Sequence, residues 1–290
     1  MKELSFDNGE NYFVMSGIHG QGKLYDWVVN SLDEEAKKFK ITLIIDGDVI
    51  DRGPESIRIL IDIMNRVKHK KGNLNVILLP GNHEQMMYSA IKYGIENNKW
   101  RKDDPWFHLA NHGVETAHDY LLLSDDLQDE LYEFLGSLPL FCRIKGKKNE
   151  TSYVIVHALA PTNALTAPKI PTLKDIESRK DLQVLKYCLQ YRKSDKNLNI
   201  HIPNISIQED NVITIIGHTP VEELQGYRME EDRHLLMIDG GCSYIAQNPN
   251  SIWQTEMLTV ARLSPNADEI AFGTYGGSKE KILRQPAKKI

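Results

Sequence analysis

Six short apolar runs, each closed by polar residues, constrain the fold of this 290-residue chain more than any other feature. They are rich in β-branched residues and end in Gly, Asp, His or Asn, as buried strands do. Apolar residues at helical spacing follow the first two runs, from Leu24 to Leu32 and from Ile57 to Met64. This β-α-β-α order predicts an α/β fold whose sheet has helices on both faces. The runs are residues 12–15, 43–45, 76–79, 153–156, 212–216 and 235–238.

Three stretches depart from this alternation. Residues 85–135, which include Trp100 and Trp106, have a helical pattern and predict a sub-lobe beside the sheet. Residues 160–210 contain several prolines around one helical segment, which indicates an insertion or lid. Residues 277–290 form a basic tail. Because no linker divides the chain, we expect a single domain over residues 1–290.

Composition excludes several classes of function. A formal charge of −5 provides no global attraction to nucleic acid or to an acidic membrane, so neither is an expected partner. Three cysteines outside any CxxC pair indicate reduced core thiols, and not a disulfide framework or a structural zinc site. Without an N-terminal apolar segment or a run of about 20 apolar residues, we expect a cytoplasmic protein. Delivery by a specialised secretion system and the oligomeric state both stay open.

Polar residues with metal-ligand chemistry follow these strands. Since ligands of α/β sheets bind where the strands end, we expect these side chains to meet at one edge. Asp48 offers a carboxylate and Asn82 an amide oxygen, and His19, His157 and His218 offer imidazoles. Such a set suits manganese, iron or zinc better than calcium. The segments after the strands are His19, GDVIDRG (47–53), GNHE (81–84), His157 and GHTP (217–220).

Taken singly, most of these segments indicate little. A histidine after a strand is more often a hydrogen-bonded core residue than a ligand, so HALAP (157–161) or GHTP alone would predict no site. GDVIDRG is stronger, because two carboxylates and an arginine packed between glycines are costly to bury without a metal or a phosphate. The conjunction of all five segments at strand ends therefore favours a metal site.

The order of the motifs resembles that of the calcineurin-like metallophosphoesterases, and within them the phosphoprotein phosphatase branch. GDVIDRG, PGNHEQMM, YVIVHALAP, GHTP and MIDGG follow one another over roughly residues 12–245. GNHEQMM is also similar to the compact bacteriophage lambda-type and bacterial Ser/Thr phosphatases. The resemblance implies an αββα β-sandwich of mixed sheets flanked by helices.

A centre with two divalent metal ions is also implied by the resemblance. Asp48 would bridge the ions, and His19 would bind the first one. The second ion would be bound by Asn82, His157 and His218. Manganese is the expected metal, with iron or zinc as alternatives.

The resemblance also implies catalytic roles for four further residues. His83 would be the general acid, oriented by Asp51. Arg52 would hold the phosphate, and Arg192 in LQYRKS is the candidate for a second phosphate-binding arginine.

The implied reaction is hydrolysis of a phosphomonoester. Two ions about 3.5–4 Å apart lower the pKa of a bridging water, so that a metal-bridging hydroxide attacks phosphorus directly. A serine or threonine alkoxide is a poor leaving group and needs a proton, which an imidazole can deliver near neutral pH. The expected substrate is a phosphoprotein or phosphopeptide, on Ser/Thr and also on Tyr. A symmetrical dinucleoside tetraphosphate hydrolase is the alternative, since DRGPES (51–56) is similar to its turn.

One position departs from the family pattern. In VMSGIHG (14–20), Ser16 and Gly17 stand where the family has Gly-Asp, so the first ion lacks a carboxylate ligand. We therefore expect a weakened first metal and reduced activity. The glycine could be engineered or natural, and a natural one suggests a phosphate-binding pseudophosphatase. Alternatively, a water molecule takes the missing ligand position, and a high metal concentration restores part of the activity. In a fourth explanation Asp46, which is expected to share a strand face with Asp48, is a substitute ligand.

Overall fold

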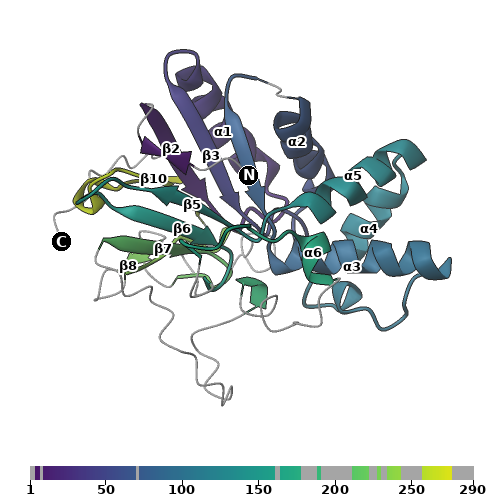
Figure 1. Cartoon of the computed structure of the whole chain (residues 1–290). Helices are drawn as coiled ribbons and strands as arrows, with labels where there is room; N and C mark the ends of the chain where they lie inside the picture. The colour runs from purple at the N-terminus through teal and green to yellow at the C-terminus, as the bar shows by residue number, and fades with distance from the viewer. Residues whose placement is uncertain are drawn as a thin grey trace.

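Two mixed β-sheets pack face to face at the centre of the protein, with helices outside them (Figure 1). The computed structural model describes residues 4–6, 9–69, 72–160, 164–177, 188–190, 211–221, 227–229, 234–242 and 257–275. One sheet has the strand order β11-β10-β2-β3-β4 and the other the order β1-β5-β6-β7-β9-β8. The αββα sandwich is therefore confirmed.

The five-stranded sheet contains a parallel unit, β2-β3-β4, with β10 antiparallel to β2 and β11 antiparallel to β10. Its strands are β2 (Glu10–Met15), β3 (Lys40–Asp46), β4 (Asn75–Leu79), β10 (Leu258–Arg262) and β11 (Ala271–Tyr275).

A second parallel unit, β6-β7-β9, lies in the six-stranded sheet, with β5 antiparallel to β6 and β8 antiparallel to β9. The short β1 pairs parallel with β5 at the edge. The strands are β1 (Leu4–Ser5), β5 (Phe141–Lys145), β6 (Ser152–Val156), β7 (Val212–Ile216), β8 (Arg228–Met229) and β9 (Leu235–Met237).

All six predicted strands are confirmed, and they are the six strands of the two parallel units. A single sheet with helices on both faces was wrong, because the two units belong to different sheets. Side chains alternate along each strand, so Tyr12 and Val14 join Ile155 and Ile215 in the core between the sheets. Met15 points the other way, into the core under the helices.

The predicted helices α1 (Gly22–Ala36) and α2 (Ser56–His69) are present. They cover the outer face of the five-stranded sheet, where Val28 and Ile63 are buried with Leu43 and Leu78. Burying each such side chain stabilises the fold by about 1.5–3 kcal/mol. The packing fixes the loops that precede both helices, and those loops contribute to the site described below.

Residues 85–135 are mostly helical, as predicted. They contain most of α3 (Asn82–Asn97), the 3-10 helix η2 (Pro105–Phe107), α4 (Gly113–Leu121) and most of α5 (Asp125–Ser137). Figure 1 shows these helices projecting together from one end of the sandwich. Since α3 begins within GNHE, the helical lobe is joined directly to a predicted metal-binding segment.

Of the predicted insertion at 160–210, only residues 164–177 and 188–190 are described, and they include α6 (Leu173–Glu177). The basic tail at 277–290 lies outside the described residues. Another 3-10 helix, η4 (Ala267–Glu269), precedes β11.

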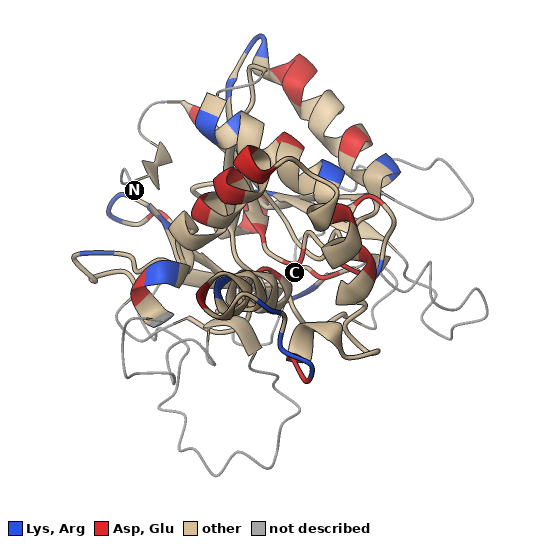
Figure 2. Cartoon of the chain, turned by 90° about the vertical axis from the view of Figure 1, so that its right-hand side faces the viewer, with Lys and Arg blue, Asp and Glu red and all other residues tan. Residues whose placement is uncertain are grey.

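No helix in the described ranges is long and apolar enough to cross a membrane. Acidic and basic residues are interspersed over the helical side (Figure 2), and all three cysteines are buried thiols.

Candidate metal centre

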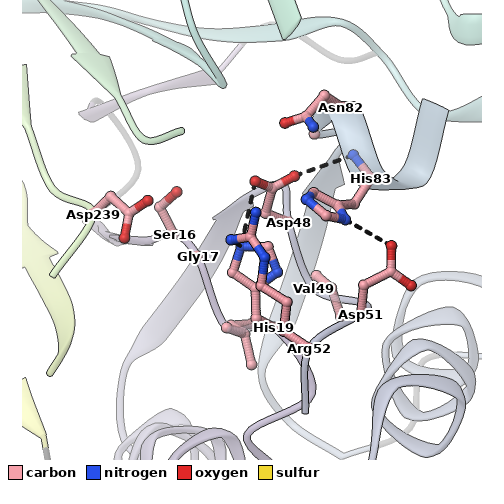
Figure 3. Close-up of polar contacts among 12 residues, drawn as sticks. Ser16, Gly17, His19, Asp48, Val49, Asp51, Arg52, Asn82, His83 and Asp239 are labelled. Atoms are coloured by element: carbon pink, nitrogen blue, oxygen red, sulfur yellow. Dashed lines mark hydrogen bonds and ion pairs between the residues drawn. The ribbon is translucent and has the colours of Figure 1, made fainter. Parts of the chain in front are cut away.

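The ends of both parallel units meet at one place, where the two sheets adjoin. The five-stranded sheet contributes the loops after β2, β3 and β4, which carry His19, Asp48 and Asn82. The six-stranded sheet contributes His157 after β6 and His218 after β7. Figure 3 shows Asp48 between His19 on one side and Asn82 on the other. The structure thus brings together all five predicted metal ligands from five separate loops.

Asp48 lies at the centre of this group. Its Oδ2 atom is 3.5 Å from His19 Nε2 and 3.3 Å from His157 Nε2. Two ligand atoms that each lie about 2.0–2.2 Å from one ion are roughly 3.0–3.5 Å apart, so these spacings fit shared coordination. Ligand atoms within 4.8 Å of one another form two groups, His19-Asp48-His83 and Asp48-His157-His218. Asp48 belongs to both groups, as a bridging carboxylate would.

Backbone carbonyls fix the orientation of two imidazoles. His19 Nδ1 is 2.9 Å from the carbonyl oxygen of Ile50, and His157 Nδ1 is 2.8 Å from that of Asp46. Each Nδ1–H donates to its carbonyl, so each Nε2 is the nitrogen that faces Asp48. Metal-binding histidines are commonly held in this way by a second hydrogen bond. Asn82 Oδ1 lies 3.3 Å from His157 Nε2 and completes the second group.

Charged neighbours set the protonation of these ligands. Burial and the Arg52 guanidinium lower the pKa of His19 well below its ordinary value, so this imidazole is neutral. Burial also opposes the charged form of His157, but the Asp48 carboxylate outweighs it and raises the pKa of His157 to about 9. Despite its burial, Asp48 has a pKa well below the usual range, because His157 and His83 surround it. A metal ion bound by His157 therefore displaces a proton, whereas His19 already has an available lone pair.

Five non-glycine residues of the centre have left-handed backbone conformations. Their φ angles are +45° at His19, +50° at Asp48, +68° at Asp51, +67° at Arg52 and +61° at His218. Such conformations are uncommon outside glycine and cost of order 1–3 kcal/mol each, so the surrounding structure must enforce them. Strained residues cluster at functional sites, and here they coincide with the predicted ones.

Glu84 is one group that enforces this backbone, and the sequence did not single it out. The carboxylate is fully buried and accepts hydrogen bonds from the backbone N–H groups of Asp48, Val49, Ile50 and Gly81 at 2.7–3.2 Å. It therefore ties the loop after β3 to the start of α3. Gly81 leaves room for this arrangement, because a Cβ there would lie 2.2 Å from Asp48 Oδ1.

His83 and Asp51 form a hydrogen-bonded pair beside Asp48, as the resemblance implies. His83 Nδ1 lies 2.6 Å from Asp51 Oδ2, and both side chains are buried. Trp106 Nε1 also donates to Asp51 Oδ2, at 2.9 Å. Sequence reasoning placed Trp106 only in the helical lobe. A chemical argument could have pointed to its role, since a buried indole N–H needs an acceptor.

The structure describes one of the two predicted phosphate-binding arginines. Arg52 Nη1 lies 2.8 Å from His19 Nε2, the nitrogen that faces the first metal position. Arg192 lies outside the described residues. The structure thus puts one guanidinium at the centre.

Gly17 also has a left-handed conformation, with φ at +65°. A Cβ built there would lie 2.7 Å from Asp239 Oδ1, which leaves no room for a side chain in this arrangement. Asp239, in MIDGG after β9, is a residue at the centre to which sequence reasoning gave no role. Burial, with the neighbouring Asp48 charge adding to it, raises the pKa of Asp239 to about 6.

Asp46 is fully buried, and neither carboxylate oxygen has a hydrogen-bond partner within the described part of the chain. Burial raises the pKa of Asp46 well above its usual value, so the acid is neutral. Among the described residues, neither group of close ligand atoms includes Asp46. Its role as a substitute ligand stays a prediction.

Comparison with known proteins agrees with this fold. The chain is similar to a Saccharomyces cerevisiae protein serine/threonine phosphatase with similarity to human phosphatase PP5, at 17% identity over 98% of this chain and 86% of that one, with a TM-score of 0.56. It is also similar to a cold-active protein-tyrosine phosphatase of a psychrophilic Shewanella species, at 16% identity over 97% and 82% of the chains, with a TM-score of 0.52. A candidate diadenosine tetraphosphatase has 12% identity over 94% and 98%, with a TM-score of 0.50.

These structural likenesses show a shared fold. No curated protein gives a significant match. The model of one family, described as calcineurin-like phosphoesterase, matches residues 12–246. With that match over most of its length and with the ligand groups at its strand ends, the chain belongs to the calcineurin-like phosphoesterase family.

Proposed function

We propose that this protein is a metal-dependent phosphomonoester hydrolase that acts on phosphoproteins, at phosphoserine and phosphothreonine and also at phosphotyrosine. The observation that carries the proposal is the buried His83–Asp51 pair directly beside the shared ligand Asp48. A proton donor next to a two-ion ligand set is the combination that cleavage of an alkyl phosphate requires.

The residues present fit two divalent ions. Asp48 would be shared, His19 would bind the first ion, and Asn82, His157 and His218 would bind the second. Their donor atoms are oxygens and imidazole nitrogens, a set that suits manganese, iron or zinc, and backbone carbonyls already orient the imidazoles of His19 and His157. When bound, the ions neutralise phosphate oxygens and activate water for attack on phosphorus.

His83 is placed to protonate the leaving oxygen. Asp51 accepts from Nδ1, which leaves Nε2 to carry the proton toward the substrate. The Asp51 carboxylate is itself held by the Trp106 indole, so the imidazole has a defined orientation. This pair matters most for serine and threonine esters, whose alkoxide leaves poorly without a proton.

Arg52 would bind the phosphate. Its planar fork matches two phosphate oxygens, and its guanidinium lies at the first metal position, 2.8 Å from His19 Nε2. His19 Nε2 cannot accept from Arg52 and bind an ion at once, so a bound ion would leave the guanidinium available to the phosphate. Arg192 stays the candidate for a second phosphate-binding arginine.

The alternative substrate is a symmetrical dinucleoside tetraphosphate. It is supported by DRGPES at 51–56 and by the fold shared with a candidate diadenosine tetraphosphatase. Its leaving group is a nucleoside diphosphate, whose phosphate oxygen departs readily without a proton donor. The two substrate classes therefore make different demands on His83.

A substrate panel on the full chain tests the proposal. Metal-free protein, with and without added Mn²⁺, would be assayed with phosphoserine, phosphothreonine and phosphotyrosine peptides, p-nitrophenyl phosphate and diadenosine tetraphosphate. We expect Mn²⁺-dependent release of phosphate from the peptides. His83→Asn should slow the phosphoserine peptide by about 10²–10⁴-fold, and p-nitrophenyl phosphate far less because its leaving group is better.

The controls separate the alternatives. Bound Mn²⁺ should be the same in His83→Asn and the parent chain, and a loss would make His83 a ligand in place of an acid. Turnover of diadenosine tetraphosphate alone would identify the alternative enzyme. Peptide binding without turnover at any metal concentration would identify a pseudophosphatase.

A further inference from the structure

Asp239 occupies the space that belongs to a side chain at position 17. The three heavy atoms nearest to a Cβ built on Gly17 all belong to the Asp239 carboxyl group: Oδ1 at 2.7 Å, Cγ at 3.0 Å and Oδ2 at 3.2 Å. In an aspartate, the carboxylate oxygens lie roughly 2.4 Å from their own Cβ. A carboxylate is therefore present about where one from residue 17 would begin, but it comes from the other sheet.

Strand pairing brings Asp239 to this place. β9 runs parallel to β7, and Ile238 N–H donates to the carbonyl of Ile216, so Asp239 follows directly at the same edge as His218. The side chain is 4% exposed. Its Oδ1 accepts a hydrogen bond from the backbone N–H of Gly241 at 2.9 Å, which orients the carboxyl group.

The same turn makes a second contact with the loop that carries His19. The Cys242 thiol donates to the carbonyl of Gly17, with Sγ and oxygen 2.8 Å apart. The thiol therefore holds residues 239–242 against Gly17, and the Asp239 carboxyl group lies over the same glycine. Figure 3 shows Asp239 beside Ser16 and Gly17, with Asp48 beyond them.

We propose that Asp239 supplies to the first metal ion the carboxylate that this chain lacks at Gly17. The proposal rests on the two-ion centre proposed above. Among the described residues, the ligand atoms grouped with those of His19 and Asp48 belong to His83. To reach the ion, the Asp239 carboxyl group would turn about its side-chain torsions. Gly17 leaves this space to the Asp239 carboxyl group, because a Cβ there would lie 2.7 Å from Oδ1 and displace it.

Asp46 is the competing source of a carboxylate. It ends β3, and its Oδ2 lies 3.4 Å from the point that a Cβ on Gly217 would occupy. Its carboxyl group is not among the atoms nearest to position 17. Asp239 therefore fits the missing ligand better than Asp46 does.

Isothermal titration of the metal-free full chain with Mn²⁺ tests the proposal, with stoichiometry and two affinities as the readout. The parent chain should bind two ions. Asp239→Asn should weaken one of them by at least about 10–100-fold and leave the other unchanged. The matched control, Asp46→Asn, makes the same chemical change in another buried acid and should leave both affinities unchanged. Electron paramagnetic resonance should show a coupled manganese pair only where two ions bind.

Moving the carboxylate back provides a second readout that does not depend on Asp239→Asn folding well. Gly17→Asp alone should weaken the first ion, because its Cβ collides with Asp239. Gly17→Asp with Asp239→Gly removes the collision and should restore two-ion binding. Asp239→Asn with both affinities unchanged, or Asp46→Asn as the weakened variant, would overturn the proposal and leave the proposed function intact. A parent chain that binds no Mn²⁺ would overturn both.

Discussion

The two halves of the metal centre are built differently. The second half draws on four loops. His157 Nε2 lies 3.3 Å from both Asn82 Oδ1 and the shared Asp48 Oδ2, and His218 belongs to the same group. The first half has His19 and Asp48. Arg52 Nη1 lies 2.8 Å from His19 Nε2, and Gly17 stands at the position of the missing carboxylate. The second half has a full set of protein ligands, taken from both sheets, whereas the first half depends on the contribution proposed for Asp239. Which residues complete a ligand set can therefore be recognised only in the folded chain, where both sheets are in place.

The most damaging change removes the residue common to both halves. Asp48→Asn takes away the bridging charge, so both ions should be lost at micromolar Mn²⁺ and turnover should fall by at least about 10³-fold, equivalent to about 4 kcal/mol of barrier. Metal analysis and p-nitrophenyl phosphate turnover measure the two effects. The account of a shared ligand fails if Asp48→Asn retains either ion at parental affinity.

Changes in one half alone should sharpen the contrast. His157→Asn should weaken the tighter ion by about 100-fold, whereas His19→Asn should weaken only the ion that is already weaker. Titration with Mn²⁺ separates the two affinities, and circular dichroism checks that both variants fold. Equal losses in the two variants would mean that the halves hold their ions with similar strength.

The smallest expected effect leaves both ions in place. Trp106→Phe keeps an aromatic ring in the pocket but removes the N–H that donates to Asp51 at 2.9 Å. We expect kcat with a phosphoserine peptide to fall by about 5–10-fold, equivalent to about 1 kcal/mol, with KM and Mn²⁺ affinity unchanged. The loss should be smaller with p-nitrophenyl phosphate, which needs less help from His83. An equal loss with both substrates would indicate a general effect on packing.

Much of this centre could be predicted from the sequence, because its residues follow buried parallel strands. Apolar runs of that kind stand out along the chain, and all six were found. The strands outside the two parallel units, β1, β5, β8, β10 and β11, were missed, because they are very short or alternate with polar residues. Without them, the assignment of β2 and β6 to different sheets could not be predicted from the pattern.

The residues that sequence reasoning missed act through contacts between distant segments. Glu84 was read as part of GNHE, but its hydrogen bonds to the loop after β3 exist only in the folded chain. Asp239 was visible in MIDGG, yet nothing in its spacing places it over Gly17. Conversely, Asp46 is only two residues from Asp48, and this short separation made it a candidate ahead of a residue from the other sheet. The predicted shared strand face was wrong, because β3 ends at Asp46 and Asp48 lies in the loop that follows, with φ at +50°.

A crystal structure of the Mn²⁺-loaded chain, with anomalous scattering to locate the ions, tests the central claim most directly. The account predicts two manganese ions about 3.5–4 Å apart, bridged by Asp48. A carboxylate oxygen of Asp239 should lie about 2.0–2.3 Å from the ion bound to His19. A single ion held by Asn82, His157 and His218, with Asp239 still hydrogen-bonded beside Gly17, would contradict it.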